Sequence, residues 1–250
     1  MYPDKDSTAQ IAVKPPAPRW RRLGLAAGVV VVAVAAGGAY AAFRTPRWYR
    51  PPVISPEERQ SVRNNLVGAE QAFTEGLRAM KGVFTYHLFQ EDLNRWIAMR
   101  REIYPLIDEL APPELAEPFV MFAQDSITIA GRYPVAGISV VVSIDIKTSF
   151  EDGAIVLRAG AVRCGSVGVP FDLDRLGLGR PIERRQNKTW PGSPRIWGDL
   201  VGGLHIGADA WWKNGGIDYR VRGISVEQGR LDLRVEPLGR HSRAGASDQS

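Results

Sequence analysis

Residues able to do metal chemistry are few in this sequence and lie far apart. His205 lies four positions before Asp209, a spacing that would place both side chains on one face of a helix as a pair of metal ligands. Zinc sites use three or four protein ligands, and no third candidate lies near this pair. His87, between Tyr86 and Leu88, is interpreted as a hydrogen-bonded structural residue. We therefore predict no metal site and no cofactor.

Candidate nucleophiles and acids are equally sparse. Cys164 follows an arginine, which can activate a thiolate, but its place in an alternating segment favours a small strand residue packed inward. Asp172 and Asp174, with His205, are the residues on which a hydrolase would depend. No nucleophile, base and orienting group come together, and the common catalytic motifs are missing from the sequence. We predict no catalytic residues and no enzyme, with an envelope hydrolase as the least favoured alternative.

A basic segment interleaved with tryptophan is the best candidate for ligand binding. Its residues are Arg184, Arg185, Lys188, Trp190, Arg195 and Trp197. Guanidinium groups and indole rings together can hold anionic lipid headgroups or envelope polymers, and the pair Trp211-Trp212 adds further aromatic surface. The alternative is a solvated basic loop over 180–195 whose tryptophans rest against a sheet. Both interpretations stay open.

The positive charge of the chain is confined to one end. The formal net charge is +5, from 32 basic and 27 acidic residues. Residues 1–50 hold 8 of the basic and 2 of the acidic residues, which leaves 24 basic and 25 acidic residues in 51–250. The larger part is thus nearly neutral, so the sequence predicts no nucleic-acid partner.

An apolar segment near the N-terminus has the length of a membrane span. Leu23–Phe43 carries no charged residue, and about 20 apolar residues cross a bilayer core as a helix. Basic and aromatic residues at both ends predict anchoring at the headgroups. They are Trp20, Arg21, Arg22, Arg44, Arg47, Trp48 and Tyr49. The sequence predicts a single-pass signal anchor in a bacterial cytoplasmic membrane, with the C-terminal domain extracytoplasmic.

Two alternatives concern this segment. Ala39-Tyr40-Ala41 has the form of a signal-peptidase site, although the apolar run is longer than a usual signal peptide. Gly24 and Gly28 have the GxxxG spacing through which a homodimer could form, but glycine and alanine are frequent throughout the segment. We favour an uncleaved anchor, and a chance GxxxG match.

Helical spacing dominates the first part of the domain. Ser55 and Glu58 form a capping box with Pro56 between them, and apolar residues follow at spacings of three and four. They are Val62, Leu66, Ala69, Phe73, Leu77 and Met80. This pattern predicts an amphipathic helix of roughly 25 residues. A strand over 83–89, a helix over 90–102 and a short helix over 104–118 follow.

Alternation dominates the rest. Apolar residues at every second position over 138–147, 155–164, 217–222 and 231–236 predict antiparallel strands with one wet face. Asp152-Gly153 predicts a hairpin turn. The predicted fold class is α+β: an N-terminal transmembrane helix, then a long amphipathic helix packed on a curved antiparallel sheet of hairpins. The predicted segments are a cytoplasmic tail (1–22), the span (23–43), a linker (44–54), an extracytoplasmic domain (55–238) and a disordered tail (239–250).

Two short motifs resemble bacterial single-pass membrane proteins of the YpmS type. Phe89-Gln90-Glu91-Asp92-Leu93-Asn94 resembles the start of their second helix, and Gly165-Ser166-Val167-Gly168-Val169-Pro170 resembles their Gly-Pro segment. The order of elements agrees over roughly 55–236, but the basic stretch 180–195 departs from the pattern. The resemblance implies a membrane-anchored extracytoplasmic domain of undefined function, with no catalytic residues to carry over.

The sequence thus predicts a binding or assembly domain of the bacterial cell envelope that contacts lipid or another apolar ligand. The alternative is a ligand-free scaffold subunit of an envelope complex. The membrane is the predicted partner in both cases, together with a lipid or an envelope protein. An apolar cavity between the long helix and the sheet would favour the first hypothesis, and a filled core would favour the second.

Overall fold

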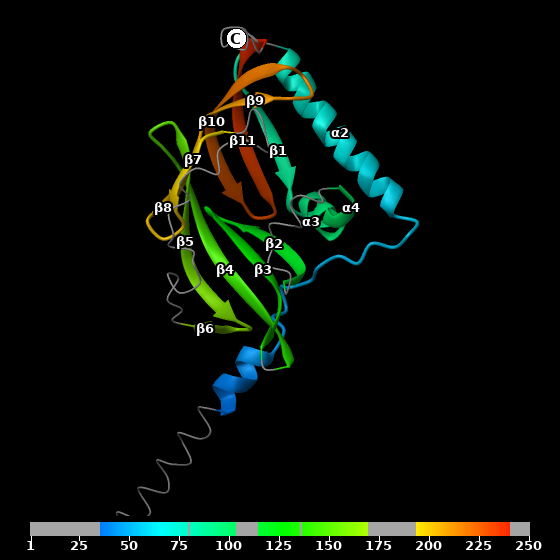
Figure 1. Ribbon diagram of the computed structural model, residues 1–250, viewed down its shortest axis with the longest axis vertical. Coiled ribbons are helices and arrows are strands. Elements are labelled where there is room, and N and C mark those ends of the chain that lie inside the picture. Colours follow the sequence, from blue (N-terminus) through cyan, green and yellow to red (C-terminus); the bar gives the residue numbers. More distant parts are fainter. Residues whose placement is uncertain (1–35, 80, 104–114, 136, 170–193, 241–250) are drawn as a thin grey trace, which may run out of the picture. The chain divides into compact units, whose positions relative to one another are not determined.

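The computed structural model describes residues 36–79, 81–103, 115–135, 137–169 and 194–240 (Figure 1). The chain divides into two compact units, 1–40 and 41–250. In the first unit, residues 36–40 are helical, and the same helix continues to residue 43. The second unit contains two antiparallel sheets together with the helices α2, α3 and α4.

The elements of the second unit follow one another in a mainly β order. The helices are α2 (Arg59–Arg78), α3 (Gln90–Ala98) and α4 (Arg100–Ile103). The strands are β1 (Phe84–Phe89), β2 (Ala116–Ala123), β3 (Ser126–Val135), β4 (Ile138–Glu151), β5 (Ala154–Cys164), β6 (Val167–Val169), β7 (Ile196–Asp199), β8 (Gly203–Gly207), β9 (Asp209–Trp212), β10 (Ile217–Glu227) and β11 (Arg230–Arg240).

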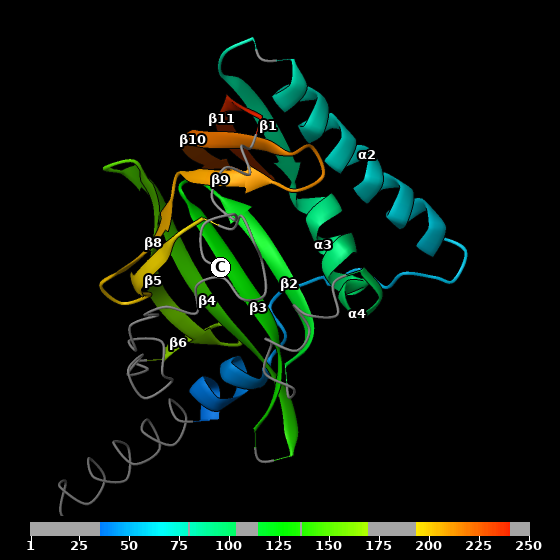
Figure 2. The same cartoon turned by 45° about the horizontal axis from the view of Figure 1, so that its top comes forward.

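The smaller sheet has four strands in the order β1-β11-β10-β9, and each neighbouring pair is antiparallel. Its strands alternate as predicted, since Val235 of β11 is fully buried and its neighbour Arg234 is exposed. Helix α2 lies along the apolar face of this sheet (Figures 1 and 2), where Phe73 and Leu77 pack against Val235. Phe73 and Leu77 of the predicted stripe therefore meet the sheet. The earlier stripe residues Val62, Leu66 and Ala69 pack instead in a cluster with Trp96 and Met99.

The start of α2 uses half of the predicted capping box. The helix begins at Arg59, and the Glu58 carboxylate accepts a hydrogen bond from the backbone N–H of Ser55 at 2.9 Å. This bond lowers the pKa of Glu58, because it favours the charged form. The residue at the N-cap position is Glu58, and its side chain makes no capping hydrogen bond to the helix. The Glu58 N–H donates to the backbone carbonyl of Ser55 at 3.1 Å, so the predicted capping box is only half formed.

The larger sheet has seven strands: β2-β3-β4-β5-β8-β7 lie side by side, and β6 pairs with β5. Its central hairpin joins β4 to β5 through Asp152 and Gly153, with φ of 49° and 73°. Two successive positive φ angles are the conformation of a type I′ turn, whose twist matches the flanking strands. The hairpin predicted from Asp152-Gly153 is confirmed.

Helix α3 closes the free edge of the larger sheet. An edge strand presents backbone groups without partners. At β2, the side chain of Asn94 accepts from the Val120 N–H and donates to the Val120 carbonyl, both at 2.7 Å. Gln90 accepts from the Phe122 N–H at 2.7 Å. Val120 and Phe122 also pack against Val226 of β10, so the two sheets share one buried cluster.

The predicted fold class is wrong. The second unit is mainly β, with two antiparallel sheets instead of one sheet of hairpins under a long helix. No helix in the described ranges is both long and apolar enough to cross a membrane. Of the predicted span Leu23–Phe43, residues 23–35 lie outside the described part, and residues 36–43 are helical.

Several element boundaries also differ from the prediction. The helix expected over 90–102 breaks at Met99 into α3 and α4. Of the short helix expected over 104–118, residues 104–114 are outside the described part and 116–118 begin β2. Of the disordered tail expected over 239–250, residues 239 and 240 belong to β11, which continues to Arg240, and residues 241–250 lie outside the described part. Arg240 pairs with Ile217 of β10, and this pairing extends β11 to Arg240.

Two predicted membrane anchors pack within the second unit. The Tyr49 ring is 4% exposed, in a cluster with Phe119 and Val141 of the larger sheet, and Trp48 packs against this cluster. The Tyr49 hydroxyl donates to the Glu117 carbonyl at 2.5 Å. Tyr49 is thus buried and Trp48 is partly buried, and the anchoring role of both stays a prediction. Arg44 and Arg47 are exposed, and Trp20, Arg21 and Arg22 lie outside the described residues.

Candidate functional site

A groove of about 260 Å³ lies between α2 and the four-stranded sheet. Helix α2 supplies one wall, the strands β1, β9, β10 and β11 supply the floor, and α3 closes one end. Its lining residues are Leu66, Ala69, Glu70, Phe73, Tyr86, Leu88, Trp96, Trp212, Tyr219 and Leu233. All but Phe73 and Trp96 remain partly open to solvent. A continuous, partly exposed apolar surface of this kind is typical of a binding site.

Phe73 is the centre of the groove's aromatic side. Its ring lies 5.0 Å from the ring of Tyr86, 4.9 Å from Trp212 and 5.5 Å from Tyr219, measured between centroids. The three contacts are edge-to-face, with interplanar angles of 73° to 85°. Such pairs fix ring orientation and each contribute about 0.5–1.5 kcal/mol beyond burial. The aromatic lining is therefore a preformed surface.

The indole N–H groups of the groove are already used by the protein. Trp212 Nε1 donates to Thr74 Oγ1 at 2.9 Å, and Trp96 Nε1 donates to Asn65 Oδ1 at 3.0 Å. The hydroxyls of Tyr86 and Tyr219 differ, because neither has a hydrogen-bond partner in the described chain. Burial raises the pKa of both tyrosines, so both stay neutral at ordinary pH.

Glu70 is the charged residue of the groove. Its carboxylate accepts one long hydrogen bond, from Asn214 Nδ2 at 3.4 Å, and no cation of the described chain forms an ion pair with it. The charges of Glu70 and Asp92 both raise the pKa of Tyr86, after the larger effect of burial. The groove therefore combines an apolar aromatic surface with one carboxylate that has no ion-pair partner in the described chain.

The predicted basic and aromatic site is only partly in view. Arg184, Arg185, Lys188 and Trp190 lie outside the described residues. The guanidinium of Arg195 lies 5.3 Å from the ring centroid of Trp197, which stacks on His205 at 5.2 Å with an interplanar angle of 12°. Arginine and tryptophan thus come together as the sequence suggested. Trp197 thus contacts both Arg195 and His205, and it is still 36% exposed.

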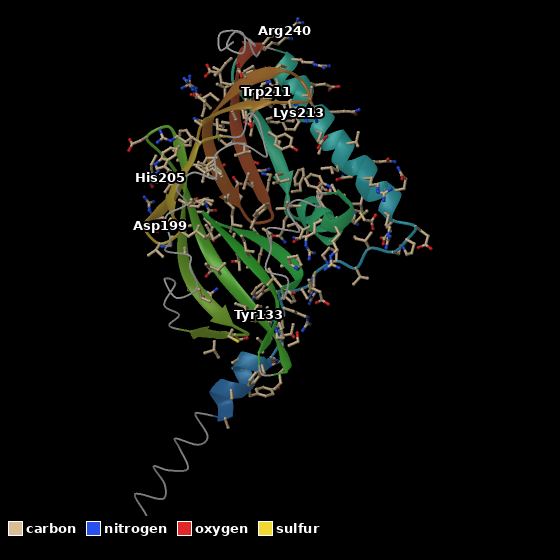
Figure 3. The ribbon with its side chains drawn as sticks, in the orientation of Figure 1. Tyr133, Asp199, His205, Trp211, Lys213 and Arg240 are labelled. Carbon is tan, nitrogen blue, oxygen red and sulfur yellow. The ribbon has the colours of Figure 1, made fainter. Side chains whose placement is uncertain are left out.

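His205 and Asp209 do not share the helix face that their spacing suggested. Both residues lie in strands, β8 and β9, and not on a helix. Figure 3 shows His205 beside Asp199 at the β7–β8 end of the larger sheet. The Arg220 guanidinium donates two hydrogen bonds to the carboxylate of Asp209, at 2.5 and 3.1 Å. Among the described residues, no three histidine, cysteine or acidic side chains gather as metal ligands would.

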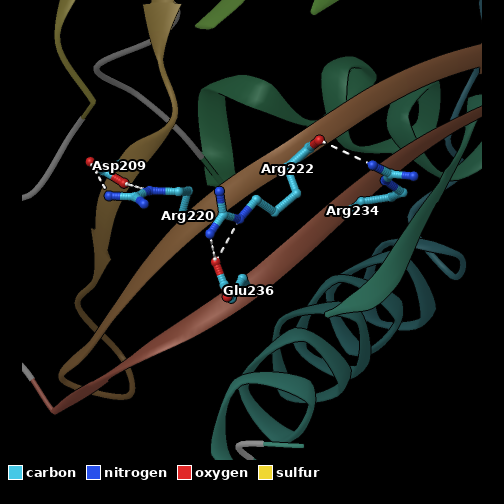
Figure 4. Close-up of polar contacts among 5 residues, drawn as sticks. All are labelled: Asp209, Arg220, Arg222, Arg234 and Glu236. Atoms are coloured by element: carbon cyan, nitrogen blue, oxygen red, sulfur yellow. Dashed lines mark hydrogen bonds and ion pairs between the residues drawn. The ribbon is translucent and has the colours of Figure 1, made fainter. Parts of the chain in front are cut away.

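The outer face of the four-stranded sheet is a ladder of charges (Figure 4). Arg220 pairs with Asp209, and Arg222 pairs with Glu236 at 2.5 Å. Arg234 donates to the Arg222 carbonyl at 3.3 Å. Two of these three arginines are thus paired with carboxylates, and exposed ion pairs of this kind contribute little to stability.

Cys164 is a free, partly buried cysteine. It ends β5, and its thiol lies 3.8 Å from the Ala42 carbonyl. Burial raises the pKa of the thiol, which is opposite to the change that activates a nucleophile. Asp172 and Asp174, the other hydrolase candidates, are outside the described residues.

A larger hollow of about 500 Å³ lies between the 51–53 segment, the end of α3 with α4, and the start of β2. Pro51, Pro52 and Pro118 are among its lining residues, together with Arg100 and Glu117. Its lining residues stand on both sides of 104–114 in the sequence, a segment that lies outside the described part.

Comparison of the chain with protein-family models, with curated proteins and with solved structures gives no match. The resemblance to YpmS-type proteins therefore stays a prediction, and the function must be argued from the groove itself.

Sequence reasoning placed Phe73 on the apolar stripe of α2 and noted Trp212 as aromatic, but it did not bring them together. Two features of the sequence pointed toward this contact. The apolar stripe of α2 must pack on a sheet, and β1 places Phe84, Tyr86 and Leu88 on one face. What was missing was the partner of β1, because β11 lies at the other end of the chain.

Proposed function

We propose that this protein is a binding domain of the bacterial cell envelope that holds an apolar ligand, such as part of a lipid, in the groove between α2 and the four-stranded sheet. The observation that supports this proposal is the groove itself: an apolar, aromatic surface left partly open between two elements that otherwise pack closely. A protein with a purely structural core would fill this space.

The size of the groove limits what it can hold. Its volume of about 260 Å³ is slightly below the roughly 300 Å³ at which pockets for drug-sized molecules begin. One ring system or one short chain fits this space, whereas a whole two-chain lipid does not. We therefore propose that one end of the ligand enters the groove and the rest stays outside.

A fluorescent apolar probe tests the proposal. The full-length chain in detergent-free nanodiscs should enhance the emission of N-phenyl-1-naphthylamine above the level seen with empty nanodiscs. Ala69→Trp, which places an indole in the groove, should remove this enhancement. Val67→Trp is the matched control, because Val67 lies on α2 outside the groove and is 50% exposed. Equal probe binding by the two variants would refute the groove as the binding site.

The location that we propose rests on the N-terminal sequence. The uncharged segment 23–43 would hold the protein at the membrane, with residues 51–250 on the outer side of it. Protease added to intact spheroplasts should digest 51–250 and spare a tag at Met1. A cleaved tag with an intact domain would reverse the orientation, and a soluble protein that begins near Ala42 would indicate a removed signal peptide.

A scaffold role is the second candidate, and one surface favours it. Ile129, Tyr133 and Ile138 lie on one face of the larger sheet and are 38%, 38% and 51% exposed. Apolar residues grouped in this way are typical of a protein interface. Crosslinking in cells should then recover a stoichiometric protein partner, and Ile138→Lys should abolish its recovery without affecting probe binding in the groove.

A further inference from the structure

The groups that the groove offers to a ligand are acceptors and aromatic faces. Glu70 contributes a carboxylate, and the hydroxyls of Tyr86 and Tyr219 can accept as well as donate. The two indole donors are occupied by Asn65 and Thr74. No lysine, arginine or histidine is among the lining residues. The site is thus built for a ligand that brings the positive charge.

Aromatic rings supply the second requirement for binding a cation. Five of the ten lining residues are aromatic, and they come from α2, α3, β1, β9 and β10. The faces of tryptophan, tyrosine and phenylalanine attract a cation that lies within about 6 Å of the ring centre. The rings around Phe73 are held by edge-to-face contacts, so their positions are set before a ligand arrives.

The acidic side chains near the groove also favour a cationic ligand. Glu70 lies on the wall that α2 forms, and Asp92 of α3 acts on Tyr86 from the end of the groove. The closest compensating contact of Glu70 is the amide of Asn214, which carries no charge. A negative potential beside an apolar surface disfavours fatty-acid carboxylates, sulfates and phosphates in the groove itself.

We propose that the groove recognises a quaternary ammonium group attached to an apolar chain. In this arrangement the aromatic rings contact the alkyl groups of the cation, and the Glu70 carboxylate faces its charge. A quaternary ammonium suits the site better than a primary amine, because it needs no hydrogen-bond acceptor at close range and loses little hydration on entering an aromatic surface. This inference rests on the proposed function, since it names the ligand class of the same groove.

Displacement of the bound naphthylamine probe by short amphiphiles with one chain length tests the inference. Hexyltrimethylammonium should displace the probe at a concentration about tenfold lower than hexan-1-ol does, and hexyl sulfate should be weaker than the alcohol. Choline, which has the head without the chain, distinguishes two sources of the cation. Weaker displacement by choline indicates a lipid-like ligand, and equal displacement indicates a free quaternary amine.

Two carboxylate variants separate the role of Glu70 from a general effect of charge. Glu70→Gln should weaken displacement by hexyltrimethylammonium about five- to tenfold and leave hexan-1-ol unchanged. Glu75→Gln is the matched control, because Glu75 is an exposed acid of the same helix that does not line the groove. It should change neither value.

The outcomes distinguish the two proposals. If the probe binds in the groove but hexan-1-ol displaces it as well as hexyltrimethylammonium does, the apolar-ligand proposal stands and the cation inference is overturned. Equal effects of Glu70→Gln and Glu75→Gln also overturn it. If the probe does not bind wild type at all, the proposed function itself fails.

Discussion

Asn94 is the buried polar side chain on which the edge of the larger sheet depends. It is 3% exposed, and its amide satisfies both backbone groups of Val120. Asn94→Ala leaves a buried N–H and a buried carbonyl without partners. Each such loss costs about 1–3 kcal/mol, so we expect the free energy of unfolding to fall by about 2–4 kcal/mol in urea titrations.

The control for this prediction is Asn64→Ala on the exposed side of α2. Asn64 accepts one surface hydrogen bond, from Gln60 at 2.9 Å. Its removal should change the free energy of unfolding by less than about 0.5 kcal/mol. Asn94→Asp separates the two bonds, since the carboxylate still accepts from Val120 N–H but cannot donate to its carbonyl. Equal effects of Asn64→Ala and Asn94→Ala would contradict the role of the edge.

The ionisation of Tyr49 should make the free energy of unfolding fall as the pH rises through the alkaline range. Burial, and then the charge of Glu117, raise its pKa from 10.0 to about 12 in the folded protein. Below pH 10 the hydroxyl is neutral in both states, and its full contribution is present. Between pH 10 and 12 the unfolded chain loses its proton first, so stability is lost as the pH rises.

Comparison with Tyr49→Phe isolates this effect from the other tyrosines. At pH 9 the wild type should be more stable than Tyr49→Phe, because it keeps the hydrogen bond to the Glu117 carbonyl. By pH 11 this advantage should shrink by about 1 kcal/mol, measured by urea unfolding at both pH values. An unchanged difference would mean that the Tyr49 hydroxyl ionises at the same pH in both states.

At the scale of the element, two glycines of α2 report how closely the helix approaches β1. A Cβ on Gly76 would lie 2.5 to 2.9 Å from the Phe84 ring, whereas a Cβ on Gly68 meets nothing within 4 Å. Glycine in a helix interior is less stable than alanine by about 0.5–1 kcal/mol. Gly68→Ala should therefore raise the free energy of unfolding by this amount.

Gly76→Ala should lower stability instead, by about 1–3 kcal/mol, because overpacking outweighs the gain in helix propensity. Thermal unfolding followed by circular dichroism compares the two variants. The same displacement of α2 should change binding of the naphthylamine probe, since the helix forms one wall of the groove. A stabilising Gly76→Ala would show that α2 is free to move away from β1.

The elements that the sequence predicted are those with long, regular periods. The apolar stripe from Val62 to Leu77 located α2, and alternation located β4, β5, β10 and β11. Strand β2 was missed because Phe119 to Ala123 is continuously apolar and Pro118 precedes it. Strands β7, β8 and β9 were missed because four or five residues are too few to show a period.

The groove could be predicted only in its parts. The sequence gives no signal for the pairing of β1 with β11, which places Tyr86 beside Leu233. Nor does periodicity tell which of two sheets α2 covers. Both depend on contacts between residues far apart in the chain, and local patterns carry no information about such contacts.

At the scale of the whole molecule, one cluster joins the two sheets. Phe122 of β2 packs with Val226 of β10 and Leu231 of β11, and the side chains of α3 complete the contact. Because this core is shared, we expect residues 41–250 to unfold in one transition. Calorimetry should give a van't Hoff enthalpy equal to the calorimetric enthalpy.

Phe122→Ala tests the shared core directly. Phe122 is 2% exposed, and its truncation should destabilise by about 3–5 kcal/mol while the unfolding stays a single transition. Two separate transitions, in wild type or in the variant, would show that each sheet is stable without the other.

The pairing of β1 with β11 also governs the order in which the protein can be completed during synthesis. His87 and Asp232 are partners in the four-stranded sheet but are 145 positions apart in the chain. A chain leaves the ribosome N-terminus first, so α2 and β1 emerge long before the strand that covers them. Until β11 follows, Phe73, Leu77 and Tyr86 have no sheet to bury them. We therefore expect the nascent chain to expose an apolar surface through most of its translation, and to need a chaperone that holds it until β11 is made.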